Sequence, residues 1–223
     1  MTSLHDSSIV IIPVGQNAIP GDLTLPVDTR AAVIFAHGSG SSRHSPRNKY
    51  VAEILNRGGI GTLLIDLLTL EEERIDIRTA EYRFNIRLLA ERLIAATDWT
   101  STDRRLSSLA LGYFGASTGA AAALVAAAER SQRIGAVVSR GGRPDLAKDA
   151  LPRIEAPTLL IVGEFDRDVI ELNLQAARAM KATTEIKIVR GATHLFEEEG
   201  ALEEVAALAR EWFEDKLIRR RAA

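Results

Sequence analysis

Cysteine is absent from this sequence of 223 residues. Its absence excludes a disulfide framework, a zinc site built on thiolates and a cysteine nucleophile. No charge of one sign dominates either, since 28 Lys and Arg residues stand against 30 Asp and Glu residues, for a formal net charge of -2. Such a balance gives no electrostatic reason to expect nucleic acid or a membrane surface as a general partner.

Long hydrophobic runs are also missing. No apolar stretch has the length of a membrane-spanning helix, and residues 1–8 lack the basic start and apolar centre of a secretory signal, so we expect a cytoplasmic location. The hydrophobic fraction of 46% and the charged fraction of 26% are typical of a globular protein. The length suits one core, and we expect residues 1–223 to form a single domain.

Short apolar runs alternate with helical segments along most of the chain. The first two runs, at 8–14 and 18–25, flank a Gly15-Gln16-Asn17 turn and predict a hairpin. The later alternation predicts an α/β fold, with a mostly parallel eight-stranded sheet and helices on both faces. The other predicted strands are 31–36, 61–67, 109–114, 134–139, 158–162 and 185–189. The predicted helices are 48–57, 81–99, 118–129, 169–182 and 199–219.

The segment from Gly115 to Gly119 has the spacing G-x-S-x-G and lies between the apolar run 109–114 and the alanine-rich run 120–128. This pattern predicts a strand, a tight turn and a helix, with Ser117 at the turn. Small residues two positions before and after the serine keep neighbouring backbone from clashing with such a strained turn. Ser117 is therefore the predicted nucleophile.

A serine hydroxyl becomes a useful nucleophile only beside a base that an acid orients. Asp166 and His194 each follow a strand-like run late in the chain, in the order nucleophile, acid, base that accompanies this turn in one class of serine hydrolase. We predict Asp166 as the acid and His194 as the base. Glu164 and Asp168 share the loop of Asp166 and stay open as alternatives, and Asp66 is a more distant one.

Acyl transfer also needs donors for the oxyanion. One is the backbone N–H of the residue after the nucleophile, Thr118. The second is expected in the loop after the run 31–36, and we predict the N–H of Ser39. His37 is expected to hold that loop by hydrogen bonds. No second metal ligand lies at suitable spacing from it, so neither a metal nor a cofactor is expected.

Three segments of the chain, His37–Ser41, Gly115–Gly119 and Gly191–Phe196, carry a family resemblance. They resemble the His-Gly-Ser-Gly-Ser, Gly-Ala-Ser-Thr-Gly and Gly-Ala-Thr-His-Leu-Phe segments of dienelactone-hydrolase-like proteins, in the α/β-hydrolase superfamily. The resemblance implies a single-domain α/β-hydrolase fold over most of the chain. Dienelactone hydrolases proper use a cysteine where this chain has Ser117, which favours ordinary ester chemistry. Some similar proteins are joined to a phosphoribosyltransferase domain, which this sequence does not contain.

Basic residues near the same sheet edge are candidate substrate contacts. Arg43 and His44 lie just beyond the predicted oxyanion loop, where a solvated loop is an equally good interpretation. Arg140 follows the strand next to that of Ser117. If its guanidinium reaches the pocket, the substrate carries a carboxylate or a phosphate.

The connection at 140–157 is too short for a separate lid domain, so we expect an open site that this segment and residues 68–80 partly cover. The sequence predicts a serine hydrolase that cleaves a small-molecule carboxylic ester through an acyl-enzyme, as a monomer or homodimer. Lactone or thioester hydrolysis and acyl transfer stay open, because a triad alone does not decide among them. A non-catalytic binding or regulatory module is the alternative from another class.

Overall fold

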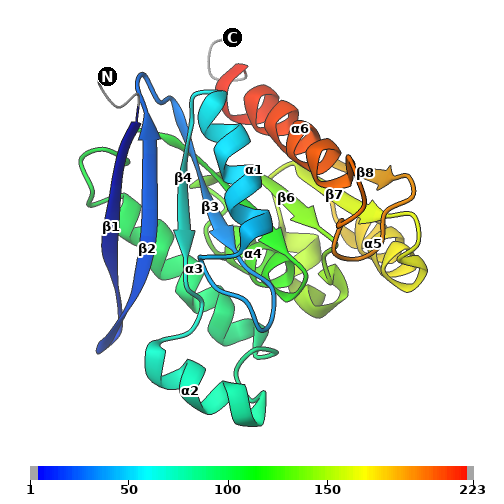
Figure 1. Cartoon of the computed structure of the whole chain (residues 1–223), viewed down its shortest axis with the longest axis horizontal. Helices are drawn as coiled ribbons and strands as arrows, with labels where there is room; N and C mark the ends of the chain where they lie inside the picture. The colour runs from blue at the N-terminus through cyan, green and yellow to red at the C-terminus, as the bar shows by residue number, and fades with distance from the viewer. Residues whose placement is uncertain (1–4, 220–223) are drawn as a thin grey trace.

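One sheet of eight strands organises the protein (Figure 1). The computed structural model describes residues 5–219. The strands are β1 (His5–Val14), β2 (Asn17–Pro26), β3 (Ala31–Ala36), β4 (Ile60–Ile65), β5 (Ala110–Ala116), β6 (Ile134–Arg140), β7 (Thr158–Gly163) and β8 (Thr184–Val189). The α-helices are α1 (Pro46–Arg57), α2 (Leu70–Thr79), α3 (Ile86–Thr100), α4 (Thr118–Glu129), α5 (Arg167–Ala179) and α6 (Ala201–Phe213).

The strand order across the sheet is β1-β2-β4-β3-β5-β6-β7-β8. β1 and β2 run antiparallel to their neighbours, and all the other pairs are parallel. The mostly parallel eight-stranded α/β fold is thus confirmed. The hairpin turn is shorter than expected, because Val14 pairs with Asn17 and leaves only Gly15 and Gln16 between the strands.

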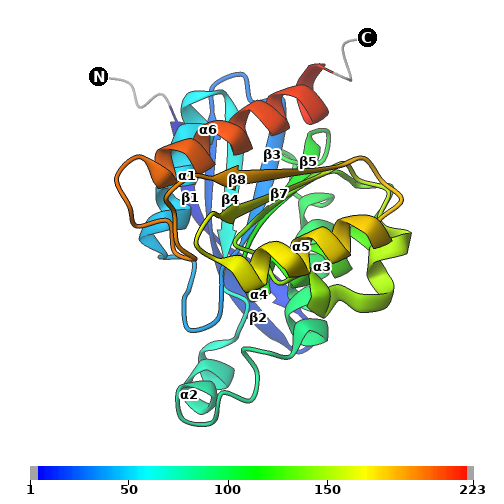
Figure 2. The same cartoon turned by 90° about the vertical axis from the view of Figure 1, so that its right-hand side faces the viewer.

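Helices cover both faces of the sheet (Figures 1 and 2). Alternate residues of β3 show why: Val33 and Phe35 pack in the cluster of α1 and α6, whereas Ile34 packs in the cluster of α3, α4 and α5. A strand buried on both sides reads as a continuous apolar run, which is the pattern that predicted the central strands. The described residues form one domain around these two layers, and none of their helices is both long and apolar enough to cross a membrane.

The segment between β4 and α3 differs most from the expectation. The predicted helix 81–99 begins only at Ile86, where the Asn85 side chain accepts a hydrogen bond from the Leu88 N–H. Phe84, which lies within the predicted range but before the observed helix, is 59% exposed. The preceding residues form the unpredicted helix α2, which stands away from the sheet in Figure 2.

Two further helical turns depart from the expectation. Residues Pro144–Arg153 form a 3₁₀-helical stretch after β6. The predicted helix 199–219 ends as α6 at Phe213 and continues as a short π-helical turn, Glu214–Ile218.

Candidate active site

Ser117 lies between the end of β5 and the first turn of α4, with φ 50° and ψ -119°. A non-glycine residue with positive φ is strained by about 1–3 kcal/mol and persists only where its surroundings hold it. The two glycines of the motif show what holds it. A Cβ at Gly115 would lie 2.4 Å from the Ala120 Cα, and one at Gly119 would lie 2.3 Å from the His37 carbonyl oxygen. Only glycine lets these backbone segments meet around the serine.

Asp166 and His194 meet from two different loops. Nδ1 of His194 donates to Oδ2 of Asp166 across 2.6 Å. Asp166 stands at the N-cap of α5 but makes no capping hydrogen bond with its side chain, so its carboxylate is directed to the histidine. Asp168, the alternative acid, lies in the first turn of α5. With Nδ1 as the donor, Nε2 of His194 is left to accept a proton.

Close backbone contacts hold these two loops together. A Cβ at Gly163, the last residue of β7, would lie 2.5 Å from the carbonyl oxygens of Ala192 and Thr193. Oε2 of Glu164 accepts a hydrogen bond from the Gly191 N–H at 2.8 Å. Glu164 therefore supports the histidine loop from outside and is not the partner of His194.

The end of β6 connects Ser117 to the histidine. The Ser117 N–H donates to the Arg140 carbonyl at 3.2 Å. A Cβ on the next residue, Gly141, would lie 3.5 Å from His194 Cε1. Since His194 borders the residue after Arg140, the serine turn, the histidine and the aspartate occupy one edge of the sheet.

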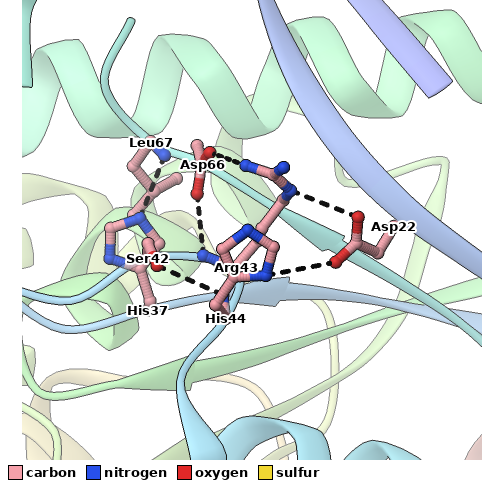
Figure 3. Close-up of polar contacts among 7 residues, drawn as sticks. All are labelled: Asp22, His37, Ser42, Arg43, His44, Asp66 and Leu67. Atoms are coloured by element: carbon pink, nitrogen blue, oxygen red, sulfur yellow. Dashed lines mark hydrogen bonds and ion pairs between the residues drawn. The ribbon is translucent and has the colours of Figure 1, made fainter. Parts of the chain in front are cut away.

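The loop after β3 is fixed by His37. Its Nδ1 donates to the Gly38 carbonyl at 2.9 Å. Its Nε2 accepts from the Leu67 N–H at 3.1 Å, a contact drawn in Figure 3. Both contacts require the neutral ring with the proton on Nδ1. Burial lowers the pKa of His37 and outweighs the Gly38 carbonyl and the nearby carboxylates, which act to raise it. His37 thus makes the kind of loop-holding contacts expected of it.

A cavity of about 210 Å³ adjoins the turn that bears Ser117. Ser39 and Thr118, the residues predicted to supply the oxyanion donors, both line it. Part of the segment 68–80 lines it as well, through Leu68, Glu73, Asp76 and Ile77. The segment 140–157, expected to share in covering the site, does not line this cavity.

Arg43 and His44 do not lie where a substrate contact was expected. Arg43 donates to Asp66 with its backbone N–H at 2.7 Å and with its guanidinium, and its Nε donates to Asp22 at 3.2 Å. His44 Nδ1 lies 3.7 Å from the same Asp22 (Figure 3). The charge of Arg43 is thus balanced within the protein, and neither residue lines the cavity. Their contacts fasten the loop after β3 to β2 and to the end of β4.

An ion pair that the sequence did not predict, between Asp76 and Arg83, lines the cavity. Asp76 of α2 is buried, and it binds the Arg83 guanidinium at 2.7 Å and the N–H groups of Tyr82 and Arg83. The contact between Asp76 and Arg83 could not be predicted, because helix α2 was not predicted from the sequence. Within residues 5–219 no group of three histidine or acidic side chains is placed to hold a metal ion.

Arg140 is buried, with 7% of its surface exposed, and it does not line the cavity. Its side chain lies on the face of β6 that also carries Val138, toward the cluster of α1 and α6. Burial, with a smaller effect of the neighbouring Arg47 charge, lowers the pKa of Arg140 to about 10. The Arg140 guanidinium therefore stays charged near neutral pH. It lies on the face of the sheet opposite to α3 and α4.

Comparison with known proteins finds relatives in sequence and in fold. The crystal structure of a dienelactone hydrolase from Anabaena variabilis is 55% identical, covers 96% of this chain and 99% of its own, and superposes with a TM-score of 0.94. The structure of Est1E from Butyrivibrio proteoclasticus shares the fold at 17% identity, covering 94% of this chain and 99% of its own with a TM-score of 0.78.

A Mycobacterium tuberculosis protein called "Putative phosphoribosyl transferase" is 54% identical over 214 residues, or 96% of this chain. The chain spans 47% of the length of that curated relative. Residues 29–217 match the Dienelactone hydrolase family. This match takes in the serine turn, the aspartate and the histidine, and the chain therefore belongs to the dienelactone hydrolase family.

Proposed function

We propose that this protein is a serine hydrolase that cleaves carboxylic esters through an acyl-enzyme intermediate. The observation that carries the proposal is the 2.6 Å hydrogen bond from His194 to Asp166 at the sheet edge where Ser117 is held with positive φ. Membership of the dienelactone hydrolase family and the likeness in fold to esterases support a hydrolase.

In the proposed reaction His194 Nε2 removes the proton of Ser117 as Oγ attacks the ester carbonyl. The N–H groups of Thr118 and Ser39 stabilise the oxyanion, and Asp166 stabilises the imidazolium that forms. His194 then gives its proton to the leaving alkoxide, which departs as the alcohol. Water, deprotonated by His194, attacks the acyl-enzyme and releases the acid and the free serine.

The cavity beside Ser39 and Thr118 is the proposed place for one part of the ester. Its volume of about 210 Å³ suits a small group better than a long acyl chain. The lining includes the apolar Leu67, Leu68 and Leu89 as well as serines and charged side chains. We therefore expect short-chain esters to be preferred.

The test is the hydrolysis of p-nitrophenyl esters from acetate to octanoate. The wild type is expected to favour the short chains, and Ser117→Ala is expected to lose activity by about 10⁴-fold or more, since the nucleophile acts as one unit with its base. A fluorophosphonate probe should label the wild type and not the variant. Ser107→Ala, at an exposed serine between α3 and β5, is the matched control and should keep both properties. Undiminished turnover in Ser117→Ala would refute the mechanism.

A lactone hydrolase is the second candidate, because the solved structure at 55% identity bears the name dienelactone hydrolase. The same triad would open a lactone by the same attack, with the alkoxide kept on the product. Comparing kcat/KM for a five-membered lactone with that for methyl butyrate decides between the two. Phosphoribosyl transfer, named for a relative about twice as long, is not proposed for this chain.

A further inference from the structure

Arg140 is one of two arginines that lie buried among the described residues. The charge of one arginine is paired with a carboxylate, and that of Arg140 is not. Arg92, the other, is 8% exposed and donates to Glu72 at 2.5 Å. Arg140 forms no ion pair with any carboxylate in residues 5–219, and its buried Nε and Nη1 have no hydrogen-bond partner there. Buried charges are ordinarily paired, because the loss of hydration costs several kcal/mol per ion.

The first turn of α1 adds further positive character near Arg140. Arg47 lies in that turn, and its charge contributes to the lowered pKa of Arg140. Arg47 also binds Glu197 in the loop that follows His194, and a Cβ on Gly141, the residue after Arg140, would lie 3.1 Å from the His194 carbonyl oxygen.

The turn contains no acidic residue and lies at the positive end of the helix dipole. Pro46 has no N–H, and the Asn48 N–H donates to Ser45. The Arg47 N–H is therefore the one that is left for a ligand. Nε of Arg47 is buried and has no hydrogen-bond partner within the described residues.

A ligand could reach Arg140 from outside. Of the three guanidinium nitrogens, Nε and Nη1 are buried without a partner, whereas Nη2 is not among the fully buried atoms. The residue as a whole keeps 7% of its surface exposed. Arg47 is held by Glu197, whose side chain is 64% exposed, through a hydrogen bond of 2.8 Å. An exposed ion pair of this kind contributes little stability, so Arg47 can exchange Glu197 for a ligand.

We propose that Arg140, Arg47 and the first turn of α1 form a binding site for a carboxylate or phosphate group, and that the ester substrate carries such a group. The second half of this inference rests on the proposed hydrolase. The Ser117 N–H already donates to the Arg140 carbonyl, so the two positions are neighbours in the sheet. The cavity of Ser39 and Thr118 lies on the other flank of the serine, which leaves the Arg140 flank for the charged part of the ester.

The first experiment requires no catalysis. Thermal unfolding of the wild type is measured with inorganic phosphate or with succinate, at constant ionic strength set by sodium chloride. A concentration about five times the dissociation constant should raise Tm by about 2–4 °C. The anion that raises Tm at the lower concentration identifies the preferred group. No rise with either anion overturns the proposal.

Arg140→Met removes the site and is expected to abolish this rise. Without anion, its Tm should equal or exceed that of the wild type, because an uncompensated buried charge is replaced by an apolar side chain of similar length. Arg140→Lys keeps the charge without the planar fork and should retain a smaller rise. A lower Tm of both variants without anion, or an undiminished rise in Arg140→Met, would contradict the proposal.

Arg143→Gln is the matched control. Arg143 lies three residues after Arg140, and Asp145 already binds its guanidinium through two hydrogen bonds of 2.8 Å. Its removal should leave the anion-dependent rise in Tm unchanged. Loss of the rise in this control as well would indicate a diffuse charge effect and not a site at Arg140.

The second experiment concerns the substrate. Hydrolysis of monomethyl succinate is compared with that of methyl butyrate, and of 2-acetoxyethyl phosphate with ethyl acetate. In Arg140→Met the ratio of kcat/KM for the charged over the neutral ester should fall about tenfold or more. An unchanged ratio would refute the role in substrate binding. If the wild type cleaves none of these esters, the proposed hydrolase fails, while the anion site still stands or falls by the unfolding experiment.

Discussion

Gly119 marks the closest approach of the serine turn to the loop after β3. A Cβ there would lie 2.3 Å from the His37 carbonyl oxygen, and backbone cannot yield as a flexible side chain can. We expect Gly119→Ala to lower stability by about 1–3 kcal/mol and to abolish most of the proposed ester hydrolysis by displacing the proposed oxyanion donors. Thermal unfolding and p-nitrophenyl acetate turnover measure the two effects.

Gly135→Ala is the comparison for this change. Its Cβ would lie 2.9 Å from the side chain of Leu217, which can move, and the site is at the opposite end of β6. Turnover should stay at the wild-type level. Full activity in Gly119→Ala would contradict the close packing of the two loops.

His37 predicts a dependence of stability on pH. Burial lowers its pKa from the ordinary value of 6.5, so the neutral ring contributes stability that is present above pH 6.5 and is lost as the pH falls toward the folded pKa. Protonation also removes the acceptor of the Leu67 N–H. Urea unfolding between pH 7.5 and 5 should show this decline, and His37→Gln should flatten it. An identical slope in the variant would exclude His37 as its source.

Single residues at strand ends could be predicted because the sheet fixes where each strand stops. The apolar runs before Ser117, Asp166 and His194 place all three at one edge, and the structure brings the last two within 2.6 Å. Side-chain partners from remote segments could not be predicted. Arg43 binds Asp22 and Asp66, which lie 21 and 23 residues away in the sequence, and no local pattern encodes that pairing.

At the scale of elements, α2 depends on polar contacts at its start. Thr69 and Glu72 form a capping box, and Oε1 of Glu72 also accepts from the buried Arg92 of α3. Thr69→Ala should destabilise α2 by about 1 kcal/mol. Glu72→Ala should cost about 3 kcal/mol, because it also leaves the Arg92 guanidinium unpaired. Hydrogen exchange of the α2 amides and urea unfolding would check both, and equal effects of the two variants would contradict this ranking.

The sequence contains a capping signal for α2, although it lacks the apolar periodicity of a buried helix. The spacing Thr69-x-x-Glu72 is that of a capping box, but the helix that follows is rich in charge and has only one buried residue, Asp76. By contrast α4, an alanine-rich helix that is buried along most of its length, was predicted to the residue. The start of α3 was misplaced, because Phe84 continues the apolar spacing but lies outside the helix.

At the scale of the whole molecule, the two layers of the core share one sheet. Phe114 of β5 stacks on Phe35 in one layer, with ring centroids 4.8 Å apart, whereas Tyr113 is buried in the other. We expect a single cooperative unfolding transition with a heat-capacity change of about 3 kcal/mol/K.

Phe114→Ala should lower the free energy of unfolding by about 3–5 kcal/mol, and Tyr113→Phe should lower it by less. Both variants should still unfold in one transition. In scanning calorimetry, a single transition is shown by equal calorimetric and van't Hoff enthalpies of unfolding. Two separated transitions in either variant would show that the layers unfold independently.

The way α2 is attached gives this sheet a replaceable part. Capping contacts hold its start, the Asp76–Arg83 pair holds its end, and its body stands clear of the strands (Figure 2). Residues 69–85 could therefore be exchanged for the corresponding segment of a homologue in a chimera without repacking either layer, provided that Glu72 is kept as the partner of Arg92. Because this segment borders the cavity, such transplants would alter the range of esters that the proposed hydrolase accepts, while Ser117, Asp166, His194 and their scaffold stay constant.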